Sequence, residues 1–309
     1  MQVYLPIADL PVNMFLIVGM GLTVGFISGM FGVGGGFLMT PLLIFIGVPP
    51  AVAVASVTSH IAASSFSGAL TYWRKRAVDL WLAFILLTGG ILGTALGVWL
   101  FTLLRSIDLL DLIISLSYVI LLSTVGGLML VESVQAILRS IRGQPVLLRR
   151  PGSHAWFHGL PLKTRFKRSK IYVSAIPVVA IGIIIGFVGA IMGIGGGFML
   201  VPMLIYLLRV PTATVIGTSN VLTLVTMASA IVMHAVTNHL VDAMLALMLM
   251  AGGVIGAQFG ARAGHNMAAE RLRFLLGLLV LAVGIRFALD LFVTPKDLFS
   301  IRSVMGDGG

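Results

Sequence analysis

The stretch Gly-Val-Gly-Gly-Gly-Phe at residues 32–37 occurs a second time, as Gly-Ile-Gly-Gly-Gly-Phe at residues 193–198. A proline follows each copy, at Pro41 and at Pro202. Apolar sequence lies on both sides of each copy, so both glycine clusters lie in hydrophobic surroundings. A run of glycines lets the backbone leave helical geometry, because no Cβ restricts it. We therefore predict that the two clusters break membrane helices near the middle of the bilayer.

The composition indicates a membrane protein. Of 309 residues, 59% are hydrophobic and only 10% are charged, whereas soluble domains carry roughly 25% charged residues. The net charge of +10 does not indicate a nucleic-acid partner, because the basic residues lie between apolar spans, as positive-inside loops do. The chain has no cysteine, which excludes disulfides and thiolate metal sites. The sequence thus predicts an all-α polytopic membrane protein in a lipid bilayer.

The apolar segments fall into two sets of five. We expect a membrane repeat over residues 1–132 and a second over residues 171–309, with half-helices at 36–48 and 197–209 that are too short to cross a core of about 30 Å. An odd number of segments per repeat predicts inverted repeats, as in many transporters. The predicted segments are 12–31, 36–48, 50–73, 77–104 and 108–132 in the first repeat, and 171–192, 197–209, 211–236, 240–264 and 270–293 in the second.

The two repeats also match outside the glycine clusters. Thr58-Ser59-His60 corresponds to Thr218-Ser219-Asn220, and Asp79 corresponds to Asp242. The glycines of 89–97 correspond to those of 252–260, and their spacing is typical of close helix contacts.

A basic linker over residues 133–170 separates the repeats. Positively charged loops stay on the cytoplasmic side, so we expect this linker in the cytoplasm and both termini outside it. The expected location is the bacterial cytoplasmic (inner) membrane, with several crossings.

The glycine clusters are the first candidate solute site. A half-helix that starts at a glycine break points free N–H groups and a positive dipole end at its surroundings, which suits an anion. The alternative is that the glycines serve only for close helix packing. The candidate residues are Gly34, Gly35, Gly36, Gly195, Gly196 and Gly197.

Hydroxyl and amide side chains are the second candidate. Thr58, Ser59, Thr218 and Ser219 could donate to an oxyanion, and His60 and Asn220 could add donors. The alternative is that the hydroxyls bond to their own helix backbone, as is common in membrane helices.

Other classes of site lack support in the sequence. No Asp or Glu falls in the middle of a predicted segment, which disfavours cation transport and proton relays. We see neither a catalytic constellation nor a spacing of metal ligands. We therefore predict no enzyme activity, no cofactor and no metal site.

These motifs together resemble the sulfite exporter TauE/SafE family of bacterial membrane permeases. The doubled glycine stretch carries the resemblance, with Gly159–Lys163, Gly217-Thr218-Ser219, Ala235–Asn238 and Gly252–Gly260 in the second half. The first repeat departs from it, with Ser56-Val57 before Thr58-Ser59. The resemblance implies export of sulfite, an organosulfonate or a related small sulfur-containing anion. An anion channel, a non-transporting membrane sensor and a membrane enzyme stay open as alternatives, as does a homo-oligomer.

Overall fold

The computed structural model describes residues 2–31, 35–141, 161, 163–166, 168–169, 171–207, 210, 212–263 and 269–292. Gly34 and most of the linker therefore lie outside the described residues. The helices of the first half are α1 (Met14–Phe31), α2 (Gly36–Phe45), α3 (Pro50–Arg74), α4 (Leu80–Ser106) and α5 (Leu110–Ile141). Those of the second half are α6 (Ala175–Met192), α7 (Gly197–Tyr206), α8 (Thr212–Met233), the π-helix η1 (His234–Asn238), α9 (Ala243–Ala263) and α10 (Ala269–Phe292).

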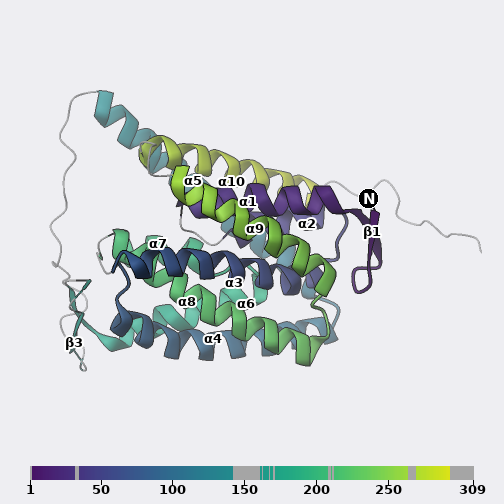
Figure 1. Cartoon of the computed structure of the whole chain (residues 1–309), viewed down its shortest axis with the longest axis horizontal. Helices are drawn as coiled ribbons and strands as arrows, with labels where there is room; N and C mark the ends of the chain where they lie inside the picture. The colour runs from purple at the N-terminus through teal and green to yellow at the C-terminus, as the bar shows by residue number, and fades with distance from the viewer. Residues whose placement is uncertain are drawn as a thin grey trace, which may run out of the picture.

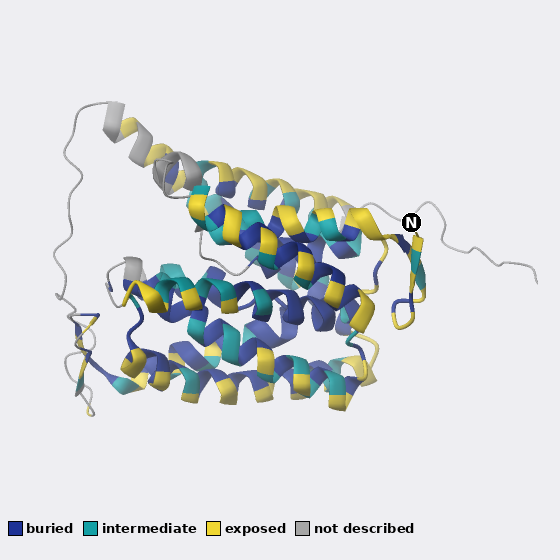
Figure 2. Ribbon diagram, viewed as in Figure 1, coloured by how far each residue is buried: buried dark blue, intermediate teal, exposed yellow. Residues whose placement is uncertain are grey.

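The prediction of a helical membrane protein is confirmed. Among the described residues, five helices are long and apolar enough to cross a bilayer, namely α4, α5, α6, α8 with η1, and α9. Large apolar side chains such as Trp81, Phe84 and Trp99 point outward from α4 and are more than half exposed, and exposed positions recur along the outer faces of the helices (Figure 2). In a membrane, this exposed apolar surface faces lipid.

The two predicted half-helices are present. Helices α2 and α7 have ten residues each, which corresponds to about 15 Å, half of the hydrocarbon core. Each begins within its glycine cluster and contains its proline, Pro41 or Pro202.

Two short antiparallel hairpins were not predicted. One pairs β1 (Gln2–Leu5) with β2 (Leu10–Asn13), and the other pairs β3 (Lys163–Phe166) with β4 (Ile171–Ser174). Their four-residue strands give too short a pattern to be recognised in the sequence. Helix α5 also extends to Ile141, past the expected border at residue 132.

The helices form two layers (Figure 1). Helices α1, α2, α5, α9 and α10 lie in one layer, and α4, α6, α7 and α8 lie in the other, with α3 in contact with both α8 and α9. Helices pair across the two halves of the chain: α1 with α9, α4 with α6, α5 with α10, and α3 with α8. Neither half is therefore a separate body, while the inverted orientation of the repeats stays a prediction.

Glycines set the two closest of these pairings. A Cβ added at Gly93 on α4 would lie 2.1 Å from the carbonyl oxygen of Ile183 on α6. A Cβ at Gly256 on α9 would lie 2.1 Å from the carbonyl oxygen of Leu22 on α1. The prediction that these glycines make close helix contacts is confirmed.

Candidate functional site

The two glycine breaks touch each other inside the protein. Gly35 and Gly196 precede α2 and α7 with φ angles of 63° and 43°, values that favour glycine. A Cβ added at Gly36 would lie 2.5 Å from the carbonyl oxygen of Gly193. In the part of the chain that the structure describes, neither half-helix start is capped by a side chain. Gly35, Gly36, Gly195, Gly196 and Gly197 are all buried.

Apolar rings and side chains fill this crossing. The rings of Phe37 and Phe198 stack with centroids 4.3 Å apart and an angle of 13° between planes. The Ile61 side chain occupies the space beside Gly195, where an added Cβ would lie 2.3 Å from it. The Thr223 hydroxyl donates to the Gly195 carbonyl at 3.2 Å. The crossing is therefore closed in this conformation.

Three of the four candidate hydroxyls form hydrogen bonds within the protein, to their own helix or to the start of a neighbouring one. The Thr58 hydroxyl donates to Ala55 O, and the Ser219 hydroxyl donates to Ile216 O at 3.0 Å. The Thr218 hydroxyl accepts a hydrogen bond from the Asp79 amide at 3.2 Å. Ser59 is buried at 6% exposure.

The contacts pair Ser56, not Thr58, with Thr218. The Ser56 hydroxyl accepts from the Asp242 amide at 3.0 Å, just as Thr218 accepts from Asp79. Asp79 and Asp242 also play the same part, because each accepts an N–H bond from the first turn of the helix that follows it. The residue of the first repeat that is equivalent to Thr218 is therefore Ser56, two residues before Thr58, which the alignment of the Thr-Ser motifs had paired with it.

His60 and Asn220 have different surroundings. His60 is fully buried, its Nδ1 lies 2.8 Å from Leu249 O, and its ring packs on Gly253. Asn220 donates from Nδ2 to Ile216 O at 2.9 Å. Its side chain lies against Gly68, and both residues line a cavity.

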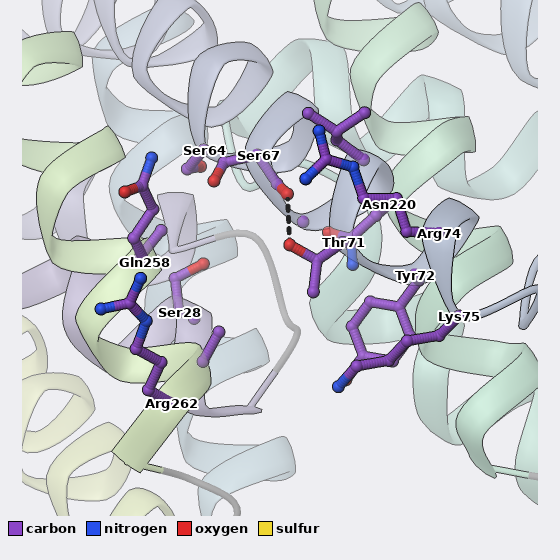
Figure 3. A pocket seen from close by; sticks show the side chains of 15 residues that line it. Ser28, Ser64, Ser67, Thr71, Tyr72, Arg74, Lys75, Asn220, Gln258 and Arg262 are labelled. Atoms are coloured by element: carbon purple, nitrogen blue, oxygen red, sulfur yellow. Dashed lines mark hydrogen bonds between the residues drawn. The ribbon is translucent and has the colours of Figure 1, made fainter.

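This cavity of about 490 Å³ is the strongest candidate site in the described structure. It lies between α1 and α9 on one side and α3 and α8 on the other. Figure 3 shows Ser28, Gln258 and Arg262 across from Thr71, Tyr72 and Asn220. Its lining residues are Ser28, Gly29, Ser64, Ser67, Gly68, Leu70, Thr71, Tyr72, Arg74, Lys75, Asn220, Ala257, Gln258, Ala261 and Arg262.

The cavity has a basic mouth and a buried, neutral polar interior. Arg74, Lys75 and Arg262 are exposed, whereas Ser28, Ser64 and Asn220 are buried at 4–6% exposure. No acidic residue is among its described lining residues. Positive charge at the mouth and hydroxyl and amide groups inside suit a small oxyanion.

The interior of the cavity adjoins the glycine crossing. A Cβ added at Gly35 would lie 3.0 Å from the Cβ of Ser28. One lining residue, Ser28, therefore lies against the first glycine break. Of the candidate residues, the structure brings Asn220 into the lining and Gly35 next to it.

Sequence reasoning missed most of the lining. Ser64, Ser67 and Thr71 follow the i, i+3, i+7 spacing of one helix face, and this signal could have identified the α3 side of the cavity. Gln258 and Arg262 are four residues apart on α9, which places them on one helix face as well. Ser28 has no such neighbour among the lining residues of α1.

Comparisons with known proteins agree with this architecture. The sequence profile of the family described as "Sulfite exporter TauE/SafE" matches residues 17–287. A "Probable membrane transporter protein" of Xylella fastidiosa (strain 9a5c) is 30% identical over 88% of this chain and 94% of its own. The "Probable membrane transporter protein YjnA" of Bacillus subtilis is 25% identical over 87% of this chain and 98% of its own. No solved structure matches the chain significantly.

Proposed function

The chain belongs to the sulfite exporter TauE/SafE family of membrane transporters, and from that premise we propose that it exports a small sulfur-containing anion across the bacterial cytoplasmic membrane. The expected solutes are sulfite, an organosulfonate or a related anion. The observation that carries the proposal is the cavity with three basic residues at its mouth and buried Ser28, Ser64 and Asn220 inside.

The cavity opens at the end of the helices that carries the basic loop residues. Arg74 and Lys75 end α3, and Arg262 lies in the last turn of α9. The hairpin β3–β4, which begins within the last part of the basic linker, lies at this end, whereas β1 lies at the opposite end (Figure 1). By the positive-inside rule this end is cytoplasmic, so the cavity is open to the cell interior and receives anions from it.

The route continues from the cavity to the glycine crossing. An anion that passes Ser28 meets Gly35, at the start of α2. The N-terminal ends of α2 and α7 supply N–H groups and positive dipole ends to an anion there. The packing of Phe37 on Phe198 closes this step in the present conformation, so passage requires the two layers to move.

The membrane potential favours export. An inside-negative potential drives each negative charge outward with about 2.3 kcal/mol per 100 mV. This drive requires no coupling carboxylate in the route.

A flux screen tests the proposal. Purified protein in proteoliposomes is offered sulfite, thiosulfate, taurine, sulfoacetate and sulfolactate, with an imposed potential. We expect saturable accumulation of at least one of these solutes above the level in empty liposomes. A flux that does not saturate would favour an anion channel, and no flux for any solute would favour a non-transporting sensor.

A further inference from the structure

A polar cluster lies at the end of the helices opposite the cavity. The Arg105 Nη1 donates to the carbonyl oxygen of Asn238 at 2.8 Å. The Thr102 hydroxyl lies 3.0 Å from Asn238 Oδ1 and 2.9 Å from Val98 O of its own helix, and its single hydrogen is shared between these two acceptors. Asn238 Nδ2 lies 3.2 Å from Nδ1 of His234, and His234 Nε2 lies 3.2 Å from Ala190 O. We call Thr102, Arg105, Ala190, His234 and Asn238 the latch.

The latch joins three helical elements of both halves. Thr102 and Arg105 end α4, Ala190 lies in the last turn of α6 just before the second glycine break, and His234 and Asn238 bound η1. His234 and Asn238 are buried, and the Phe101 ring packs edge-on against His234 with centroids 4.6 Å apart. The two contacts of His234 fit one neutral tautomer, in which Nε2–H donates to the Ala190 carbonyl and Nδ1 accepts from the Asn238 amide.

The latch occupies the place that corresponds to the cavity in the other repeat. Ser56 and Thr218 are equivalent positions of the two repeats. Tyr72 follows Ser56 by sixteen residues and lines the cavity, and His234 follows Thr218 by the same sixteen residues. Tyr72 and His234 are therefore equivalent positions too. The cavity lies where α3 faces α1 and α9, and the latch lies where α8 and η1 face α6 and α4. The interfaces of α3 thus enclose an open cavity, whereas the equivalent interfaces of α8 and η1 are closed by hydrogen bonds.

We propose that the latch is the outer gate of the route and that transport requires its hydrogen bonds to break. This inference rests on the proposed function, since it assigns the closed end of the same route. The π-helical form of η1 supports it, because π turns are rare and frequent at functional sites. If η1 changed from π-helical to α-helical hydrogen bonding, Asn238 would move away from Thr102 and Arg105.

Cysteine accessibility tests the gate without depending on flux. The natural chain has no cysteine, so Thr226→Cys and Ser67→Cys can each be the single thiol. Thr226 is buried on α8 and stands eight residues after Thr218, as cavity-lining Ser64 stands eight after Ser56. A membrane-impermeant maleimide is applied to intact cells and to inside-out vesicles. We expect Ser67→Cys to react only in the vesicles and Thr226→Cys to react little in either.

Weakening the latch should expose the cysteine of Thr226→Cys to the outside of the cell. Thr102→Val removes the hydroxyl that bonds Asn238, and we expect it to raise the labelling rate of Thr226→Cys in intact cells roughly fivefold, the shift that losing one hydrogen bond produces. Arg105→Gln, at an exposed side chain, should act in the same direction. Thr88→Val is the matched control, because Thr88 lies on α4 and, like Thr102, donates to a carbonyl of its own helix. It therefore measures the effect of losing that bond alone.

The outcomes separate the gate from the solute. Unchanged labelling with both Thr102→Val and Arg105→Gln in monodisperse protein overturns the gate, even if the parent transports anions. Increased labelling supports the gate, and if the parent then moves no anion, only the proposed function fails. Labelling of both reporters from the same side of the membrane overturns the assignment of cavity and latch to opposite ends.

Discussion

Phe37 and Phe198 stack 4.3 Å apart, although 161 positions separate them in the sequence. Each is the second residue of a ten-residue helix whose N-cap glycine has a positive φ angle. The stack therefore joins the starts of the two half-helices. The cavity residue Ser28 lies close to one of the two glycine breaks.

The basic mouth should attract the solute. We expect Arg262→Gln to raise the KM for the transported anion roughly tenfold at low ionic strength, because a charged funnel concentrates counter-ions, and to have less effect at high salt. Initial-rate flux at two salt concentrations measures this. Arg76→Gln is the control, since Arg76 follows α3 next to the cavity-lining Arg74 and Lys75 but does not line the cavity. Equal KM values for Arg262→Gln and the parent would remove Arg262 from the route.

Two glycine substitutions should fail in different ways. Gly68→Ala puts a methyl 2.9 Å from the Asn220 amide oxygen; this side chain can turn, so we expect folded protein with altered solute affinity. Gly256→Ala puts a methyl 2.1 Å from the Leu22 carbonyl, and forcing two backbones apart costs about 1–3 kcal/mol or more. Gel filtration and thermal melting should show loss of folded protein only for Gly256→Ala. The same loss for Gly68→Ala would contradict the adaptable position of Asn220.

Thr218 should contribute to stability rather than to the solute site. Thr218→Val leaves the buried Asp79 amide without its acceptor, at a cost of about 1–3 kcal/mol. We expect a lower melting temperature with unchanged flux per folded molecule, and the same result for Ser56→Ala at the equivalent position. Thr124→Val, at an exposed position that bonds its own helix, should leave the melting temperature unchanged. A Thr218→Val protein that melts like the parent but binds the anion more weakly would return Thr218 to the solute site.

The sequence predicted the helical architecture because that information is local. Glycine clusters, prolines and segment lengths identified α2 and α7, and the spacing of glycines such as Gly93 and Gly256 identified surfaces of close contact. The hairpins were missed because hydrogen bonds to distant residues hold them: Ser169 donates to Asp79, and the Ile7 amide donates to Asp242.

The cavity could not be predicted because it depends on which helices pair. Ser28 on α1 and Gln258 on α9 both line the cavity, and only the contact between α1 and α9 brings them together. A glycine surface in the sequence does not reveal its partner helix. The equivalence of Ser56 with Thr218 was likewise hidden, because the more obvious Thr58-Ser59 motif lies two residues further on.

The most direct test of the account is anion flux through Gly35→Val and Gly196→Val, normalised to correctly inserted, monodisperse protein. Valine at either position meets a positive φ angle that β-branched residues rarely adopt. At Gly196 its Cβ would also lie 2.4 Å from Ile185. We predict that both variants lose flux per folded molecule, and that Gly→Ala at each position is milder. If both valine variants fold stably and transport at the parent rate, the glycine crossing is not part of the route.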